Sequence, residues 1–443
     1  MQIKAVYREM WKSKGHYDLV VVGAGPAGIG ASVAAARRGL RVALIEAFGF
    51  AGGVGTQSLC PIYFGFGVEG KQTTAGLSEE FIRRMDDLGA ATFFLYDSHE
   101  VPEYSKIGDR PLTTKVLLDG EVMKLVYNRM LVEAGVELFY YTHMAEVFTE
   151  NGRISSVLLS ALEGNYLLSA DTFIDATGNA QLAFLADSSA VNVCSAEDGM
   201  HNSMFFIVDG VKDFDHDTAK RIYKEAREAG RLPEKVWPHF GFATLLKRGM
   251  MQIAVCFDIG NGADSREMTA MELGMRENVF KVLEFLKREI PGFEDCYLTA
   301  TPSKIGVRTS RSIVSVCDFN ADALMSDDYY HPIALCRRIY GMHSNSTKSF
   351  SSSWTSGAGG IGAVPMEALV SAKFKNLLAA GRCIGSEPRL IGTFRMMNTC
   401  MTLGEAAGLM ATSARNGGKY AYEVSYDELY PMLCENGFIL NVK

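Results

Sequence analysis

The sequence predicts an α/β protein in which a Rossmann-like dinucleotide-binding domain with a β-meander is interrupted by an inserted α+β domain. Three observations predict this fold class. First, a strand, a glycine-rich loop and a helix follow one another near the start of the sequence. Second, short strands alternate with turn residues before residue 175. Third, the strand–glycine–helix pattern recurs after residue 376. We therefore expect a discontinuous dinucleotide-binding domain over 1–190 and 361–443, and a substrate or cap domain over 191–360.

The first element is a buried strand that enters a glycine-rich loop. An apolar run over 19–22 predicts a parallel strand, and the alanine-rich segment from Pro26 to Arg38 predicts a helix that ends at Gly39. The loop between them reads GAGPAG. A glycine-rich loop in this strand–turn–helix context is the fingerprint of dinucleotide binding.

Each glycine of the loop has a physical role in that fingerprint. Gly23 permits the tight turn, Gly25 lets a pyrophosphate approach the backbone, and Gly28 lets the helix pack closely on the strand. The helix N-terminus offers N–H groups and a partial positive charge to the phosphates. A second apolar run over 42–45 ends at Glu46, whose carboxylate can bind ribose hydroxyls and would repel a 2′-phosphate.

Further elements follow in order along the chain. Apolar spacing predicts helices, and alternating runs bounded by Asn-Gly and Glu-Gly-Asn predict a meander that ends in a strand running into Ala176-Thr177-Gly178. The expected helices cover 78–88, 120–134, 216–229 and 267–289, and the expected meander strands cover 136–141, 144–149, 154–162 and 166–170. An extended run over 304–318, a loop over 341–360, a buried strand within 376–385 and a small-residue helix from about Gly404 to Gly417 complete the pattern.

Composition excludes several classes of protein. The 443 residues carry a net charge of -7, so a basic surface for nucleic acid is not expected. The nine cysteines form no CxxC pair and the histidines no HExxH pair, which argues against a cluster, a zinc site or another metal site. The uncharged stretch over 19–36 follows four basic residues, as a signal segment would. Its glycines and proline at fingerprint positions favour a buried loop, and we expect a cytoplasmic protein without a membrane partner.

These motifs together resemble the FAD-dependent oxidoreductases of the glutathione-reductase-like flavoprotein superfamily, in a group without an assigned substrate. The resemblance rests on GAGPAGIGASVAAARRG with Glu46, on GGVGTQS, on IDATGNAQLA, on IPGFEDCYLTATPSKIGVRTSRSI and on NLLAAGRCIGSEPRLIGTFRMMNTCMTLGEAAGLMA. It implies that the dinucleotide is FAD. The cofactor-binding residues that it implies are Gly23, Gly25, Pro26, Ala27, Gly28, Glu46, Ala47, Gly52, Gly53, Thr56, Ser58, Ala145, Ala176, Thr177, Gly178, Gly381, Arg382 and Gly404.

The resemblance also implies a role for each group of these residues. The loop from Gly52 to Ser58 would run under the flavin, Ala145 would touch adenine through its backbone, and Gly381 with Arg382 would lie near the ribityl chain. A helix beginning about Gly404 would point its N–H groups at the flavin, where they stabilise negative charge. Two positions depart from the family pattern, because Asn179 and Gly341 stand where the family often has an acid.

Three residues are candidates for catalysis. Arg308 and Arg311 stand in GVRTSRSIV, where a regular strand would point them to opposite faces, and Arg311 shares its face with apolar neighbours. We therefore expect Arg311 to be the inward arginine, either as a carboxylate or carbonyl clamp or as a structural residue. Arg395, just before the last helix, and His343, which matches a family histidine, are candidates for substrate or flavin contact and for proton transfer.

The functional expectation is an enzyme that moves a hydride between flavin N5 and a small organic substrate bound between the two domains. Two alternatives stay open, namely a flavin monooxygenase and an electron-transfer flavoprotein subunit that works with a redox partner. The direction of transfer, and whether NAD(P)H, oxygen or a protein is the external electron donor or acceptor, are open as well. The scattered cysteines, among them Cys60, Cys383 and Cys400, are expected to be small buried residues rather than redox thiols.

Overall fold

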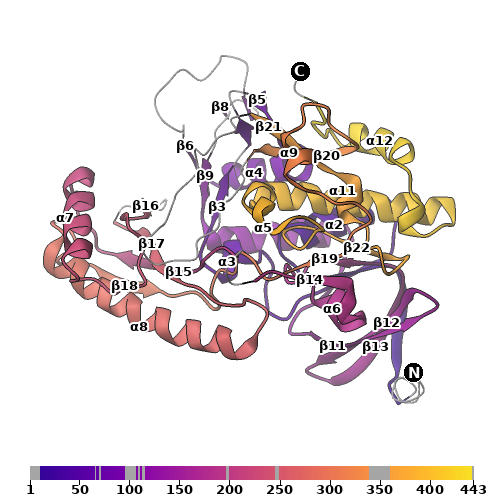
Figure 1. Ribbon diagram of the computed structural model, residues 1–443, viewed down its shortest axis with the longest axis horizontal. Coiled ribbons are helices and arrows are strands. Elements are labelled where there is room, and N and C mark those ends of the chain that lie inside the picture. The colour runs from indigo at the N-terminus through magenta and orange to yellow at the C-terminus, as the bar shows by residue number, and fades with distance from the viewer. Residues whose placement is uncertain are drawn as a thin grey trace.

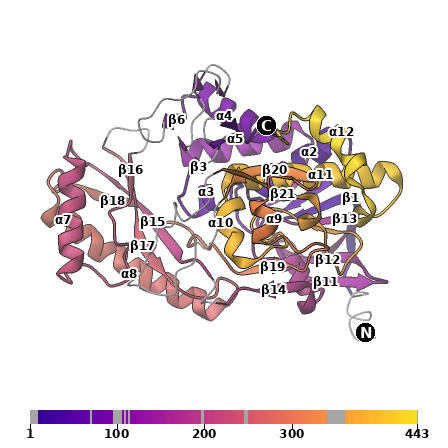
Figure 2. The ribbon, with the colours of Figure 1, turned by 45° about the horizontal axis from the view of Figure 1, so that its top comes forward.

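Two lobes make up the molecule, a larger one built from the first and last parts of the described chain and a smaller one built from its middle (Figures 1 and 2). The structure is a computed structural model that describes residues 10–64, 66–68, 71–94, 106–107, 110–111, 115–195, 199–244, 249–338 and 360–441. Within these residues no helix has the length and apolar character needed to cross a membrane.

A seven-stranded sheet forms the centre of the larger lobe. Its strands follow the order β10-β2-β1-β13-β12-β11, and β22 pairs with β13. The bounds are β1 (Ser13–Val22), β2 (Val42–Ile45), β10 (Glu137–Phe139), β11 (His143–Glu150), β12 (Arg153–Ala161), β13 (Gly164–Asp175) and β22 (Leu377–Ala379). Strands β10, β2, β1, β13 and β22 run parallel to one another. Strand β12 pairs antiparallel with β13 on one side and with β11 on the other. The pairing of β22 with β13 joins the last part of the chain to the first, as the sequence predicts.

Two details of this sheet differ from the prediction. The segment expected as the first meander strand is β10, which pairs in parallel with β2 at the sheet edge. The strands expected over 166–170 and before Ala176 are one continuous strand, β13, which pairs with the meander at its start and with β1 and β22 at its end. Strand direction depends on long-range pairing, and a change of partner within one strand leaves no turn signal in the sequence.

Apolar side chains cover both faces of the sheet, which explains why the strands are continuously apolar. Leu19 and Val21 of β1 point into a core with α2 (Pro26–Arg37) and α11 (Met397–Gly417), whereas Val20 and Val22 point into a second core under the meander and α6 (Gln181–Ala186). The fold class predicted from the sequence, an α/β protein with a Rossmann-like domain, is therefore confirmed.

Helices α2 and α11 pack against one another through glycines, and Figure 1 shows them side by side in the larger lobe. A Cβ on Gly404 would lie 1.9 Å from the backbone oxygen of Ala27, and one on Gly408 would lie 2.3 Å from that of Ala31. The helix expected to begin about Gly404 begins at Met397, so Gly404 is two turns inside it. No side-chain cap marks the true start, and for that reason the sequence placed it too late.

Further elements complete the larger lobe. The prediction of helices over 78–88 and 120–134 is confirmed by α4 (Gly76–Asp87) and α5 (Gly120–Glu133). The side chain of Asp119 caps α5 by accepting hydrogen bonds from the N–H groups of Glu121 and Val122. The helices are α3 (Val54–Gln57), α4 (Gly76–Asp87), α5 (Gly120–Glu133), α9 (Ala321–Met325), α10 (Ile391–Phe394) and α12 (Tyr426–Glu435), with short helices η1 (Ser188–Ala190), η2 (Met366–Leu369), η3 (Pro388–Leu390) and η4 (Ala421–Glu423). Small strand pairs and ladders are formed by β3 (Ile62–Phe64), β9 (Lys115–Leu118) and β6 (Ala91–Phe94), by β4 (Gly67–Val68) with β5 (Lys71–Gln72), and by β7 (Lys106–Ile107) with β8 (Arg110–Pro111).

The smaller lobe is an antiparallel sheet with two helices and has a hydrophobic core of its own. Its strands are β16 (Phe242–Thr244), β17 (Met251–Asp258), β15 (Asn202–Asp209) and β18 (Tyr297–Ala300), in that order. Helices α7 (His216–Glu228) and α8 (Ser265–Glu289) confirm the helices predicted here, and aspartates cap both. The separate core runs from Met204 to Ile305 and accounts for the inserted α+β domain.

The segment after the smaller core returns to the larger lobe earlier than expected. The extended run predicted over 304–318 contains only the short strand β19 (Arg311–Ile313), which pairs with β14 (Val191–Val193). Strands β20 (Pro332–Arg337) and β21 (Ile361–Pro365) pair with one another, and Phe319 and Ile333 pack in the larger core. Residues 319–336 therefore pack with the larger lobe. The sequence did not predict this, because an apolar run does not encode which of two cores it joins. The expected loop over 341–360 lies outside the described residues apart from its last residue.

A carboxyl group is buried inside α11. Glu405 is 2% exposed, and its Oε2 accepts a hydrogen bond from the backbone N–H of Leu77 at 2.9 Å. Burial raises the pKa of Glu405 to about 8, and nearby Glu80 adds to the rise. The folded protein therefore holds this carboxyl group protonated at neutral pH, whereas the unfolded chain ionises it near its usual pKa of 4.5.

Glu405→Gln is expected to stabilise the folded protein at neutral pH. The pKa of Glu405 is higher in the folded protein than in the unfolded chain. Its contribution to the free energy of unfolding is therefore complete below the pKa of the unfolded chain and is lost as the pH rises toward the pKa of the folded protein. An amide of the same shape suffers no such loss. We expect the variant to gain about 2–3 kcal/mol in free energy of unfolding at neutral pH and nothing at about pH 4. Urea titrations at both pH values measure this, and a gain independent of pH would contradict it.

Candidate functional site

A cleft lies where the two lobes meet. Together with the solvent at its mouth it encloses about 1270 Å³. One wall consists of the β1–α2 loop, the segment after Gly53, the turn after β13 and the end of β22. The other wall includes Ser203, Phe205 and Met268 of the smaller lobe and the segment from Lys304 to Arg308. The cleft is therefore bounded by the dinucleotide loop and by the inserted domain together.

The β1–α2 loop has the geometry that its glycines predict. Gly23 has a φ of +102°, and a Cβ there would lie 2.5 Å from the oxygen of Ala176. A Cβ on Gly28 would lie 1.8 Å from the oxygen of Gly23. Gly25 differs, because its φ of -74° suits any residue and a Cβ there meets only the Cα of Gly53, at 3.9 Å. Gly23 and Gly28 hold the loop together, whereas Gly25 faces the open cleft.

Glu46 ties the end of β2 to this loop. Its two carboxylate oxygens accept hydrogen bonds from the backbone N–H groups of Ala24, at 2.8 Å, and Phe48, at 3.0 Å. The amide of Gln57 lies 3.4 Å from one of them. Glu46 is 8% exposed and lines the cleft, so it is held beside the loop in a fixed orientation.

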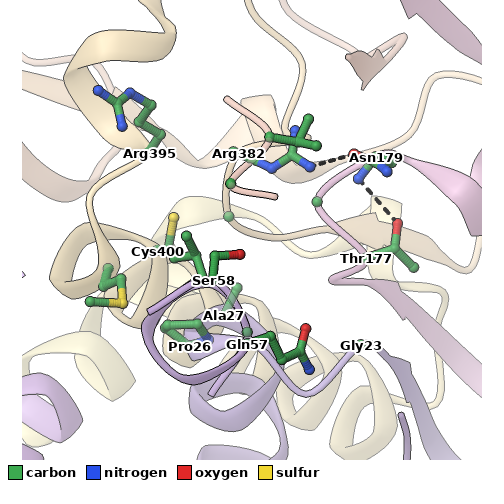
Figure 3. A pocket seen from close by; sticks show the side chains of 18 of the residues that line it. Gly23, Pro26, Ala27, Gln57, Ser58, Thr177, Asn179, Arg382, Arg395 and Cys400 are labelled. Carbon is green, nitrogen blue, oxygen red and sulfur yellow. Dashed lines mark hydrogen bonds between the residues drawn. The ribbon is translucent and has the colours of Figure 1, made fainter. Parts of the chain in front are cut away.

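The turn after β13 is fastened to the end of β22 by Arg382 and Asn179, which Figure 3 shows facing one another. Arg382 donates hydrogen bonds to the Oδ1 atom of Asn179 and to the hydroxyl of Ser310. The hydroxyl of Ser310 in turn donates to Asn179 at 2.8 Å. Asn179 stands where the related family often has an acid. Asn179 and Ser310 are neutral, so they position Arg382 without compensating its positive charge.

Two further arginines reach the cleft. Arg308 donates a hydrogen bond to the backbone oxygen of His201 at 2.7 Å, and its guanidinium lies 5.0 Å from the centre of the Trp237 ring. Arg395 has a buried Nε atom without a hydrogen-bond partner among the described residues. Burial lowers the pKa of Arg308 and of Arg395, and the charge of Arg395 lowers that of Arg308 further. Both side chains stay charged at neutral pH because arginine loses its proton only at far higher pH.

Twelve of the cofactor-binding residues expected from the sequence line the cleft. They are Gly23, Gly25, Pro26, Ala27, Glu46, Gly53, Ser58, Ala176, Thr177, Gly178, Gly381 and Arg382. Six others do not line it, namely Gly28, Ala47, Gly52, Thr56, Ala145 and Gly404.

Several of these six have a packing role instead. The hydroxyl of Thr56 donates to the oxygen of Ala51 at 2.9 Å, and a Cβ on Gly52 would meet Thr56 at 2.5 Å. Ala145 is exposed on the outer strand β11. The expectation that Gly404 begins a helix aimed at the cofactor is wrong, because it packs on Ala27 in the middle of α11. The helix start at Met397 lines the cleft in its place.

The catalytic role expected for Arg311 is not supported, whereas its contacts agree with the structural role that the sequence left open. Arg311 does not line the cleft. It is 7% exposed, donates to Gln181 at 3.1 Å and covers the ring of Phe184 at 4.1 Å, beside α6. The alternation argument failed because residues 304–310 do not form a regular strand, so Arg308 rather than Arg311 faces the cleft. Of the other two candidates, Arg395 lines the cleft and His343 lies outside the described residues.

The sequence predicted a substrate bound between the two domains but did not identify the residues that the inserted domain contributes to the site. Lys304 and Arg308 stand in KIGVR, directly after the last strand of the smaller sheet, and Gly306 pairs with Ser203 as an isolated bridge. A glycine between two basic residues at the return from an inserted domain was the available signal. Gln57 was missed as well, and its Oε1 atom is buried without a partner among the described residues.

Cys383 and Cys400, two cysteines of the larger lobe near the cleft, have buried thiols. Burial raises the pKa of Cys383 and of Cys400 to about 12, so both thiols are protonated at neutral pH. None of the nine cysteines, all of which lie in the described part of the chain, forms a disulfide bond. Within the described ranges, no three His, Cys, Asp or Glu side chains are grouped as metal ligands would be.

Comparison with known proteins identifies the family. A family model described as FAD dependent oxidoreductase matches residues 18–433. This chain belongs to that family. Its cofactor is FAD, and its activity is that of an FAD-dependent oxidoreductase. The narrower assignment to the glutathione-reductase-like superfamily stays a prediction.

Solved structures with a similar fold have low sequence identity. The chain is similar to a geranylgeranyl bacteriochlorophyll reductase-like protein from Thermoplasma acidophilum, with 14% identity, a TM-score of 0.50, and 96% of this chain and 84% of that chain covered. It is also similar to p-nitrophenol 4-monooxygenase from Pseudomonas putida, with 12% identity, a TM-score of 0.50, and 95% and 85% covered. At these identities the likeness extends to the fold alone. No curated protein matches the chain.

The residues of the cleft fit FAD. Gly25 leaves open space beside the N-terminus of α2, where a pyrophosphate can approach the backbone. The positive charge of Arg382 has no carboxylate partner among the described residues. Gln57 and Arg395 each have a buried polar atom without a partner in the same part of the chain. A dianionic pyrophosphate and a flavin edge with several hydrogen-bonding atoms would satisfy such groups.

Proposed function

We propose that this protein is an FAD enzyme that oxidises or reduces a small organic substrate held in the cleft between the two lobes. When bound, FAD supplies the redox chemistry by accepting or donating a hydride. The observation that carries the proposal is the composition of the cleft, in which the dinucleotide loop forms one wall and charged residues of the inserted segment form the other.

The residues of the larger lobe would hold the cofactor. Gly25 and the N–H groups at the start of α2 would bind the pyrophosphate, with Arg382 as its counter-charge. Glu46 would bind the adenosine ribose. The segment from Gly53 to Ser58 and the start of α11 at Met397 would contact the flavin, and the N-terminus of α11 would stabilise negative charge there.

An external electron donor or acceptor completes the proposed cycle. The fold is shared with a reductase-like protein and with a monooxygenase, so it does not choose between the alternatives. Among the described residues, one dinucleotide loop lines the cleft, which favours one bound dinucleotide. The external electron donor or acceptor would then bind separately and exchange electrons with the flavin.

The purified protein is expected to be yellow and to release FAD on acid extraction, because the loop and Glu46 accommodate a pyrophosphate and an adenosine ribose. Chromatography of the extract measures the flavin. Anaerobic bleaching of the bound flavin against a panel of metabolites, with nicotinamide cofactors included, then identifies the reductant. Fast release of hydrogen peroxide on admitting air would indicate an oxidase, and slow reoxidation would indicate a reductase. An extract with FMN alone would overturn the proposal.

A further inference from the structure

The cleft is strongly basic in a protein that is acidic overall. Four basic side chains line it, namely Lys304, Arg308, Arg382 and Arg395, and Glu46 is the single carboxylate among the described lining residues. The whole chain has a net charge of -7. The excess of three positive charges is therefore a property of this site and not of the protein as a whole.

None of these four cations forms an ion pair with a carboxylate of the described residues. The ion pairs found there include neither Lys304 nor any of the three arginines. Glu46 uses its oxygens on backbone N–H groups. Partly buried arginines without a counter-ion are costly unless a ligand supplies the negative charge.

The cofactor accounts for part of this charge. The pyrophosphate of FAD carries two negative charges and lies nearest the loop at Gly23 and Gly25 in the proposed arrangement. Figure 3 shows Arg395 toward the opposite end of the pocket from Gly23, and Arg382 beside Asn179, which lies in the turn after β13. Arg382 is thus placed for the pyrophosphate, whereas Arg395 is left with a buried Nε atom that has no partner among the described residues.

Arg308 and Arg395 approach the cleft from different parts of the chain. Arg308 comes from the return of the inserted domain and is oriented by its bond to the oxygen of His201 and by the Trp237 ring. That bond uses one Nη atom, and no protein partner among the described residues takes the remaining donors. Arg395 comes from the segment just before α11. Two arginines that line the same cleft without a carboxylate partner among the described residues offer a binding site for a planar anion.

We propose that the substrate is an organic carboxylate and that Arg308 and Arg395 bind its carboxylate group. This inference rests on the proposed function, since it names the substrate class of the same site. A carboxylate supplies the missing negative charge and accepts hydrogen bonds in the geometry that guanidinium groups offer. Arg308 then determines specificity for acids over neutral analogues, and the inserted domain supplies the substrate side of the cleft.

The test uses the FAD-loaded protein and the change of flavin absorbance on ligand binding. Acetate, benzoate and glutarate are titrated beside their neutral amides, acetamide, benzamide and glutaramide. We expect at least one acid to bind about tenfold or more tightly than its amide. Arg308→Gln and Arg395→Gln are each expected to lose that preference, and Arg308→Lys to keep part of it because it keeps the charge.

Arg221→Gln is the matched control, because Arg221 is an exposed arginine of the same lobe, paired with Glu225 on the surface of α7. It should bind acids as the parent does. The FAD content of every protein is measured first, so that a parent without FAD contradicts the proposed function itself. A parent that holds FAD but binds acid and amide equally, or binds none of the three acids, overturns only the carboxylate proposal. So does either glutamine variant that binds the acids as tightly as the parent.

Discussion

Gly25→Val is expected to give a folded protein that no longer holds FAD. The backbone at Gly25 has a φ of -74° and a ψ of 178°, which a valine adopts without strain. Its side chain would meet little protein, since a Cβ there has the Cα of Gly53 as its single close neighbour, at 3.9 Å. It would instead occupy the open space beside the start of α2, where the pyrophosphate has to approach the backbone.

The expected loss is complete at the FAD concentrations that saturate the parent. Flavin absorbance after gel filtration measures occupancy, and circular dichroism with a melting curve measures folding. Gly25→Ala should show a smaller loss than valine. Gly274→Val is a control outside the cleft, on α8, where a Cβ meets no atom closer than 4.0 Å. Full FAD occupancy in a folded Gly25→Val protein would show that the pyrophosphate binds elsewhere.

Gly404→Ala is expected to destabilise the protein strongly, although it adds only one methyl group. The added carbon would lie 1.9 Å from the backbone oxygen of Ala27, so α2 and α11 would have to separate. Overpacking of a closely packed core costs about 1–3 kcal/mol and sometimes more. Because α2 also carries the dinucleotide loop, we expect a lower melting temperature together with weaker FAD binding.

Two comparisons separate this clash from a general effect on the helix. Gly417→Ala, at the end of the same helix, should be tolerated because its Cβ would meet only the flexible side chain of Lys419. Adding Ala27→Gly to Gly404→Ala should not restore stability, since the clash is with a backbone atom. Rescue by Ala27→Gly, or a melting temperature equal to the parent's, would contradict the packing described for α2 and α11.

The helices of the smaller lobe could be predicted from local sequence patterns, whereas the pairing of strands in the larger lobe could not. The helices over 216–228 and 265–289 could be predicted because amphipathic spacing and aspartate caps are properties of neighbouring residues. The direction of β10 and the fusion of two predicted strands into β13 could not be predicted, because they depend on partners far along the chain. The return of residues 319–336 to the larger core is of the same kind.

Some features of the candidate site were likewise predictable from the sequence, and others were decided by the tertiary structure. The sequence by itself determined the dinucleotide loop, the acid at the end of β2 and the membership of an FAD family, because GAGPAG and Glu46 are set by the conformational freedom of glycine and by short-range spacing. The tertiary structure alone decided that Arg308 faces the cleft while Arg311 packs beside α6, and that Gly404 serves helix packing. Which side chain reaches a cleft between two lobes depends on how the lobes pack, and no local pattern in the sequence carries that information.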